Sequence, residues 1–266
     1  MSRLFSLAVC TLLLGLPLVA QTTPPPDGLQ APAPQITLLP FDTASAAELE
    51  SQGDMLRGQN FHLDALDSYK AAIRKQPSPA LYNKLGIVYI LLRRPADAEI
   101  AINKAIHMDK KYADAWNNLG SVYYIEGNFK RAEKEFEHAI KLNDQSASYH
   151  SNLGSAYFNH KELAKASQEF QIALKLDPYV FERSSRMGIA ALMGRPSNER
   201  AEFEYMMAKL FARSGDDANA LLHLRKALEE GYKNIDNFYK DQEFATVRTD
   251  QRFKDLLAAK PDSIPQ

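Results

Sequence analysis

The chain has 266 residues, of which 45% are hydrophobic and 24% charged, and its formal net charge is -1. This composition is ordinary for a soluble globular protein. The balanced charge argues against a nucleic-acid-binding protein, because affinity for the phosphate backbone needs a clear excess of basic residues. The only cysteine is Cys10 near the N-terminus, so the rest of the chain is predicted to lack disulfides and thiolate metal sites.

Residues 1–20 have the pattern of a secretory signal peptide. Arg3 is their only charged residue, and an apolar run from Leu4 to Ala20 follows it. We expect cleavage near Ala20 and export of the mature protein to the periplasm or the medium. The alternative is an uncleaved anchor, which would be the chain's only link to a membrane. A run of about 17 residues is at the lower limit for spanning a bilayer, and Pro17 interrupts it.

Residues 21–45 are predicted to be a linker. Residues 21–44 hold six of the fourteen prolines of the chain. Proline removes backbone hydrogen-bond donors and favours extended conformations, so this stretch is not expected to fold into an element.

An internal repeat begins near residue 46. A set of large and small apolar residues recurs after 34 residues: Leu119, Gly120, Tyr123, Ala132 and Phe136, then Leu153, Gly154, Tyr157, Ala166 and Phe170. A fixed period of this length indicates one supersecondary unit stacked on copies of itself. The apolar spacing within each unit predicts two helices, with Gly120 facing Ala132 where the helices approach. The expected units are 46–78, 79–112, 113–146 and 147–180.

The repeat pattern then becomes irregular. We interpret residues 181–200 as a half-repeat, with a full unit with degenerate positions as the alternative, and residues 201–234 as the last unit of an array that spans 46–234. Residues 235–260 are predicted to form a helical cap, because the last unit of a stack exposes an apolar face. Its buried side is expected to include Phe238, Phe244, Phe253 and Leu256, and residues 261–266 form a tail.

These repeating residues closely resemble those of the tetratricopeptide repeat family over most of 46–234. The resemblance implies an all-α fold, an α-solenoid in which helix-turn-helix units form a right-handed superhelix with a concave groove. It also implies that positions 2, 5, 6, 9, 12 and 13 of each unit tend to face that groove. Members that bind a chaperone's carboxylate tail use lysine and asparagine at positions where this chain has Glu50 and Asp54, so such a ligand is not expected.

Most side chains at the groove positions of the second to fourth units are uncharged, and many are hydrogen-bonding or aromatic. Because an asparagine amide both donates and accepts, it can bind a peptide backbone. The candidate binding residues for a peptide or partner protein are Asn83, Asn117, Asn118, Ser121, Tyr124, Asn152, Ser155, Phe158 and Asn159. The alternative is that the asparagines serve only solubility or contacts at helix edges.

Catalytic and metal motifs do not stand out in the sequence. The six histidines occupy different repeat positions, and none has a partner at metal-ligand spacing. We therefore expect a non-catalytic interaction protein without metal or cofactor, whose partner is a protein or peptide. The alternatives are an architectural subunit that binds through its convex face or half-repeat and, less favoured, a cell-envelope enzyme.

Overall fold

The computed structural model describes residues 38–183 and 197–259. The chain divides into two units, Met1–Leu38 and Leu39–Gln266, and every described helix belongs to the second. The predicted signal peptide, most of the proline-rich linker, most of the half-repeat and the tail therefore lie outside the described residues. Within the described ranges the regular structure is entirely helical.

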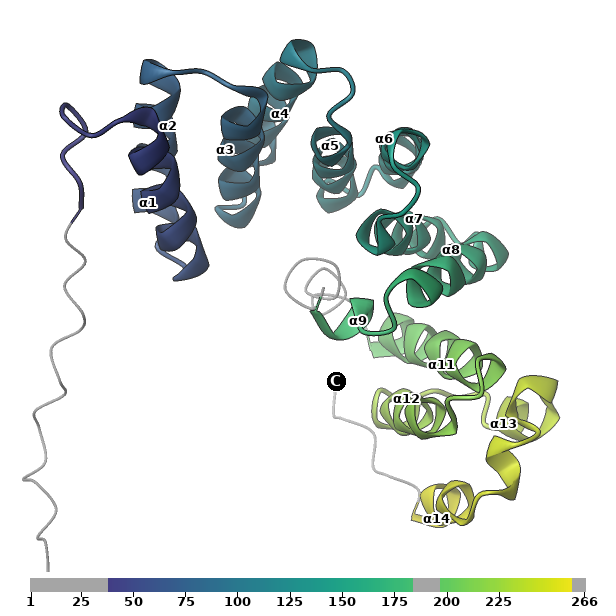
Figure 1. Cartoon of the computed structure of the whole chain (residues 1–266). Helices are drawn as coiled ribbons and strands as arrows, with labels where there is room; N and C mark the ends of the chain where they lie inside the picture. Colours follow the sequence, from purple (N-terminus) through teal and green to yellow (C-terminus); the bar gives the residue numbers. More distant parts are fainter. Residues whose placement is uncertain (1–37, 184–196, 260–266) are drawn as a thin grey trace, which may run out of the picture. The chain divides into compact units, whose positions relative to one another are not determined.

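Four antiparallel helical hairpins form the first part of the array (Figure 1). Within each hairpin the two helices pack on each other, and the second helix also packs on the first helix of the next hairpin. This consecutive packing confirms the predicted all-α solenoid. The hairpins are α1 (Ala46–Gly58) with α2 (His62–Lys75), α3 (Pro79–Leu91) with α4 (Pro95–Met108), α5 (Ala113–Ile125) with α6 (Phe129–Leu142), and α7 (Ala147–Asn159) with α8 (Leu163–Leu176).

A last hairpin and a group of short helices complete the described chain. After α9 (Val180–Arg183), the hairpin consists of α11 (Ser197–Arg213) and α12 (Asp217–Glu229), and α11 begins four residues before the expected start at residue 201. It is followed by α13 (Asp236–Lys240), η2 (Gln242–Phe244), η3 (Val247–Thr249) and α14 (Gln251–Ala259). The residues expected to face inward here, Phe238, Phe244, Phe253 and Leu256, are all buried.

In the first four hairpins, a glycine of the first helix allows a bulky side chain of the second helix to approach closely. A Cβ added at Gly120 would lie 2.6 Å from the ring of Phe136, and one at Gly154 would lie 2.6 Å from the ring of Phe170. Gly120 thus lies against Phe136, whereas the sequence predicted Ala132 as its neighbour. The aromatic ring fills the space that the missing side chain leaves, so this glycine serves packing rather than flexibility.

The turn inside each of the first four hairpins contains one residue with a left-handed backbone. In the third hairpin this is Gly127, with φ of 78°, whereas Asn60, Arg93 and Lys161 have φ of 67°, 57° and 65° at the corresponding places. Glycine adopts this conformation without the steric cost that a side chain brings. No helix in the described part of the chain is long and apolar enough to cross a membrane.

Candidate functional site

The asparagines predicted to bind a partner are instead bonded to one another between repeats. Asn118 on α5 donates from Nδ2 to Oδ1 of Asn83 on α3 over 2.9 Å, and Asn152 on α7 donates from Nδ2 to Oδ1 of Asn117 over 2.8 Å. In both pairs the donor follows the acceptor by 35 residues. The sixth position of one unit therefore donates to the fifth position of the unit before it.

The first interface uses the same positions with charged side chains. Lys84, at the sixth position of its unit, donates from Nζ to Glu50 Oε1 over 2.7 Å and to Asp54 Oδ2 over 2.6 Å. Burial alone would lower the pKa of Lys84, but the hydrogen bonds to Asp54 and Glu50 hold it above its ordinary value. We call the three contacts Lys84–Glu50, Asn118–Asn83 and Asn152–Asn117 the inter-repeat ladder.

The other predicted residues also make internal contacts. Asn159 Nδ2 donates to the hydroxyl of Tyr124 over 2.5 Å, which links the thirteenth position of one unit to the twelfth of the preceding unit. The hydroxyls of Ser121 and Ser155 donate to the backbone carbonyls four residues earlier, over 3.1 and 2.9 Å. Phe158 is only 2% exposed. These side chains therefore contribute first to the stability of the array.

A small hollow of about 70 Å³ remains above the ladder, lined in part by Asn118, Ser121, Asn152 and Ser155. Since a water molecule occupies about 30 Å³ in the liquid, this hollow is large enough for two waters or one small chemical group. The geometry thus shows contacts between helices for the ladder asparagines. Partner binding by the residues around the hollow stays a prediction.

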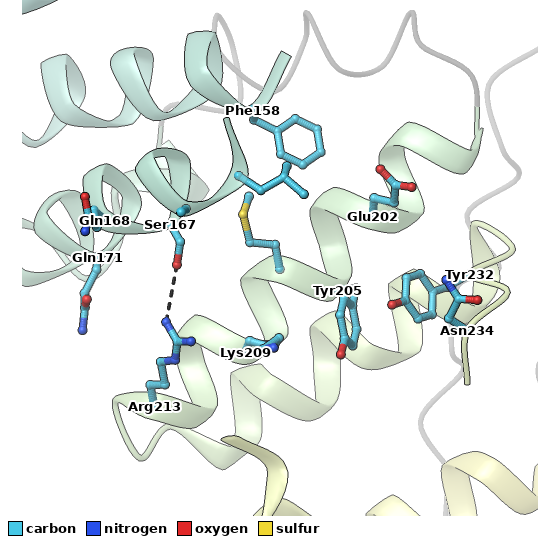
Figure 2. Close-up of a pocket in the computed structure, with 13 residues that line it drawn as sticks. Phe158, Ser167, Gln168, Gln171, Glu202, Tyr205, Lys209, Arg213, Tyr232 and Asn234 are labelled. Atoms are coloured by element: carbon cyan, nitrogen blue, oxygen red, sulfur yellow. Dashed lines mark hydrogen bonds between the residues drawn. The ribbon is translucent and has the colours of Figure 1, made fainter. Parts of the chain in front are cut away.

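A much larger cleft, of about 560 Å³, lies between α8 and α11 (Figure 2). One wall consists of residues from α11 that occupy positions 2, 5, 6, 9 and 13 of the last unit, and the other comes mainly from α8. The α11 wall comprises Glu202, Tyr205, Met206, Lys209 and Arg213; the rest of the lining is Phe158, Leu163, Ala164, Ser167, Gln168, Gln171, Tyr232 and Asn234.

Phe158 is the only predicted site residue that lines this cleft. The other predicted site residues all come from the second, third and fourth units, outside α8 and α11. Counting the groove positions from Ala201 selects all five α11 residues of the cleft. The signal was therefore present in the sequence, although the facing wall could not be inferred without knowing how α11 packs.

The ladder does not continue onto α11. The sixth position of the last unit is Met206, whose side chain has no polar donor. Instead, Phe203 joins α11 to the preceding hairpin, with its ring 5.6 Å from that of Phe158 and 5.7 Å from that of Phe170. Arg213 contacts Ser167 at the other end of the cleft, over 3.5 Å (Figure 2). The two helices are thus joined at the ends of the cleft and separated between them.

The cations of the cleft are held by carboxylates that follow α12. Lys209 Nζ lies 2.6 Å from Asp241 Oδ2, and Arg213 donates to Glu243 Oε1 over 2.5 Å. Burial alone would raise the pKa of Asp241, but the hydrogen bonds from Lys209 and the Tyr205 hydroxyl hold it below its usual range. Both cations therefore have partners before any ligand binds.

One group of side chains in the described ranges has a composition that could hold a metal ion: Glu133, His160 and Glu162, whose ligand atoms lie within 4.8 Å of one another. Nδ1 of His160 lies 2.7 Å from Oε1 of Glu133, and Glu162 forms an ion pair with Lys165. Each of the three side chains therefore has a partner within the protein, so the geometry of the group is explained without a cation.

The stack of hairpins, in which the second helix of each of the first three packs on the first helix of the next, defines a helical-repeat protein that presents a surface for binding. Tetratricopeptide repeat models match residues 51–113, 113–146 and 147–179. The chain is therefore a tetratricopeptide repeat protein. Repeats of this family are protein-interaction modules, which supports a role in binding another protein.

The solved structures to which the chain is similar are only distantly related to it in sequence. The chain is similar to PilF of Pseudomonas aeruginosa, with 19% identity, a TM-score of 0.53 and coverage of 81% of this chain and 88% of that one. It is also similar to a tetratricopeptide repeat protein of Thermus thermophilus, with 18% identity, a TM-score of 0.51 and coverage of 80% and 100%. A third, the first repeat domain of Spaghetti (RPAP3) bound to an HSP90 peptide, has 23% identity, a TM-score of 0.38 and coverage of 47% and 91%. No curated protein sequence matches the chain. Identities this low concern the fold alone.

Proposed function

We propose that this chain is an exported, non-catalytic interaction protein that holds a segment of a partner protein in the groove of its first helices. The cleft between α11, a first helix, and α8, the second helix of the preceding hairpin, is the main contact region. The observation that carries this proposal is the cleft itself. Its volume of about 560 Å³ falls in the range of roughly 300–1,000 Å³ that is usual for ligand sites.

The mixture of side chains in the cleft supports a peptide ligand. Gln168, Gln171 and Asn234 carry amides that can donate to backbone carbonyls and accept from backbone N–H groups. Leu163, which is 48% exposed, provides apolar surface beside them. A site with apolar walls and a few hydrogen-bonding groups can bind and orient a short segment.

Site-specific photo-crosslinking in the native cell tests this proposal. A photoreactive amino acid would replace one of three residues in the full chain: Gln171 in the cleft, Ser155 beside the small hollow, or Ile100 on α4, which is 64% exposed. We expect a defined crosslinked protein from Gln171, a weaker one from Ser155 and none from Ile100. Crosslinking from Ile100 alone would favour the alternative of an architectural subunit that binds through another face.

Export is a separate part of the proposal and rests on the apolar pattern of residues 1–20. Cell fractionation should place the protein outside the cytoplasm, and N-terminal sequencing of the mature form should begin at or near Gln21. Retention of Met1 on a membrane-bound form would support the uncleaved anchor. Recovery of the full-length chain in the cytoplasm would contradict export.

A further inference from the structure

The charges of the cleft bear on the kind of peptide that it accepts. Provided that the cleft binds the partner as proposed above, we infer that its ligand is an extended internal segment carrying a basic side chain next to an apolar one, and that a free C-terminal carboxylate is disfavoured. Ligands with a terminal carboxylate require cations that are available to bind it. The cations of this cleft are not available in this way, because carboxylates of the protein already contact them.

Both cations of the cleft are already neutralised from the side of the C-terminal helices. Lys209 contacts Asp241 at 2.6 Å and Glu243 at 3.5 Å, and Arg213 contacts Glu243 at 2.5 Å. A ligand carboxylate could reach either cation only by competing with these carboxylates. Because unbalanced charges in a partly buried site are unfavourable, an anionic terminus binds poorly here.

The remaining charge in the cleft is negative. Glu202 lines the cleft in the first part of α11, is exposed, and has no ion-pair or hydrogen-bond partner among the described residues. Together with Asp241 and Glu243 it gives three carboxylates against two cations. A lysine or arginine of the ligand placed beside Glu202 would restore the balance.

The apolar end of the cleft fixes where the ligand's apolar side chain lies. Glu202 lies towards one end of the cleft, whereas Ser167 and Arg213 mark the other (Figure 2). Met206 also lines the cleft, is half-buried, and follows Glu202 by one turn on the same face of α11. An apolar ligand side chain against Met206 therefore has Glu202 as its charged neighbour. The ligand should carry its apolar and basic residues close together in sequence.

The length of the cleft indicates how much chain it binds. Eleven residues separate Glu202 from Arg213 along α11, which corresponds to about 16 Å at 1.5 Å per helical residue. An extended chain covers this distance with about five residues. Gln168 and Gln171 lie along the facing wall, where their amides can bond to the backbone of such a segment.

Two phage-displayed random peptide libraries test the inference with the mature chain as the immobilised target. In the first library the peptides are internal, fused at both ends to coat protein, and in the second they end in a free carboxylate. We expect the internal library to yield sequences with lysine or arginine next to a large apolar residue. The best synthetic peptide should bind Glu202→Gln about three- to fivefold more weakly, the range of an exposed ion pair.

The matched control is Glu126→Gln, the same chemical change at an exposed residue at the end of α5 that does not line the cleft. It should leave binding unchanged. Gln171→Ala, also an exposed position, should weaken binding about fivefold through loss of a hydrogen bond. Circular dichroism of each variant establishes that it is folded.

The outcomes separate the inference from the proposed function. Enrichment of free-carboxylate peptides whose binding is lost in Lys209→Ala would overturn the inference while leaving peptide binding in the cleft intact. Basic peptides that bind Glu202→Gln and the parent equally would also overturn it. If neither library yields a binder, or if binding is insensitive to Gln171→Ala, the proposed function of the cleft fails as well.

Discussion

Replacing Asn118 with alanine tests whether the inter-repeat ladder holds the array together. Asn118 is 7% exposed and bonded to two other amides: its Nδ2 donates to Asn83 Oδ1 over 2.9 Å, and its Oδ1 accepts from Asn117 Nδ2 over 3.4 Å. Asn118→Ala removes both hydrogen bonds at once. The variant therefore leaves an acceptor on Asn83 and a donor on Asn117 unpaired.

The size of the effect follows from the burial of those two groups. Asn83 and Asn117 are 3% and 8% exposed, and an unsatisfied buried polar group costs about 1–3 kcal/mol. The hollow of about 70 Å³ beside Asn117 gives water access to one side of the ladder. Because water can then replace part of the lost bonding, we expect a total loss of about 2–3 kcal/mol, below the sum of two full penalties.

Urea denaturation followed by circular dichroism measures this loss as a change in the free energy of unfolding. Ser121→Ala is the matched control, since its hydroxyl is only half-buried and donates to a carbonyl of its own helix; it should cost less than about 0.5 kcal/mol. A double-mutant cycle with Asn83→Ala should give a coupling energy of about 1 kcal/mol. If Asn118→Ala resembles the control and the coupling is zero, the ladder does not stabilise the interface between repeats.

Two further predictions concern packing and titration. Gly120→Ala should destabilise the protein by about 1–3 kcal/mol, because the added Cβ would lie 2.6 Å from the ring of Phe136. The control is Gly58→Ala, which should be neutral or slightly stabilising because no atom lies within 4 Å of its added Cβ. If urea denaturation showed Gly58→Ala to be the less stable variant, the packing argument would be contradicted. Burial and the hydrogen bond to Glu99 raise the pKa of Tyr123 to about 12. An unfolded tyrosine titrates near pH 10, so the folded state, which retains the proton longer, should lose stability as the pH rises from about 10 to 12. Thermal denaturation across that range should show a shallower loss for Tyr123→Phe, and an equally steep loss would exclude this contribution.

The hairpins could be predicted from the sequence because their buried residues recur with the spacing of a helix face. Tyr123 and Phe136, for instance, recur as Tyr157 and Phe170, and the rings at both sites are buried. Some of their contacts lie within one unit, such as that of Phe136 with Gly120. The period of the sequence therefore determines these contacts directly, with no information about neighbouring units.

The pairing of the asparagines could not be predicted in the same way. Asn118 and Asn152 share a repeat position, but their partners lie 35 residues earlier, at a different position of the preceding unit. That offset depends on how one hairpin rotates against the next, which the period alone does not give. The sequence identified the residues of this strip correctly as a recurring polar set, while their contacts required the structure.

The cleft depends on contacts between helices that lie still farther apart in the sequence, α8 and α11. Its α11 wall follows the irregular part of the repeat pattern, after which the frame resumes with a changed offset. The width of the gap to α8 is governed by Phe203 packing on the rings of Phe158 and Phe170. Such packing between hairpins that are not consecutive in the pattern has no signature in a single sequence.

The direction of the ladder limits how this array can grow by duplication. The second, third and fourth units each donate from the sixth position to the fifth position of the unit before, and residues 113–146 carry asparagine at both places, Asn118 and Asn117. An extra copy of residues 113–146 inserted directly after the original would therefore pair an asparagine donor with an asparagine acceptor at each new contact of the ladder. A copy of residues 79–112 placed there would instead set the ammonium of Lys84 against the amide of Asn117, without the carboxylates of α1 that receive it now. Copies of the third unit can therefore follow one another in the array. If the array is lengthened by duplication, the duplicated unit should be residues 113–146 rather than residues 79–112.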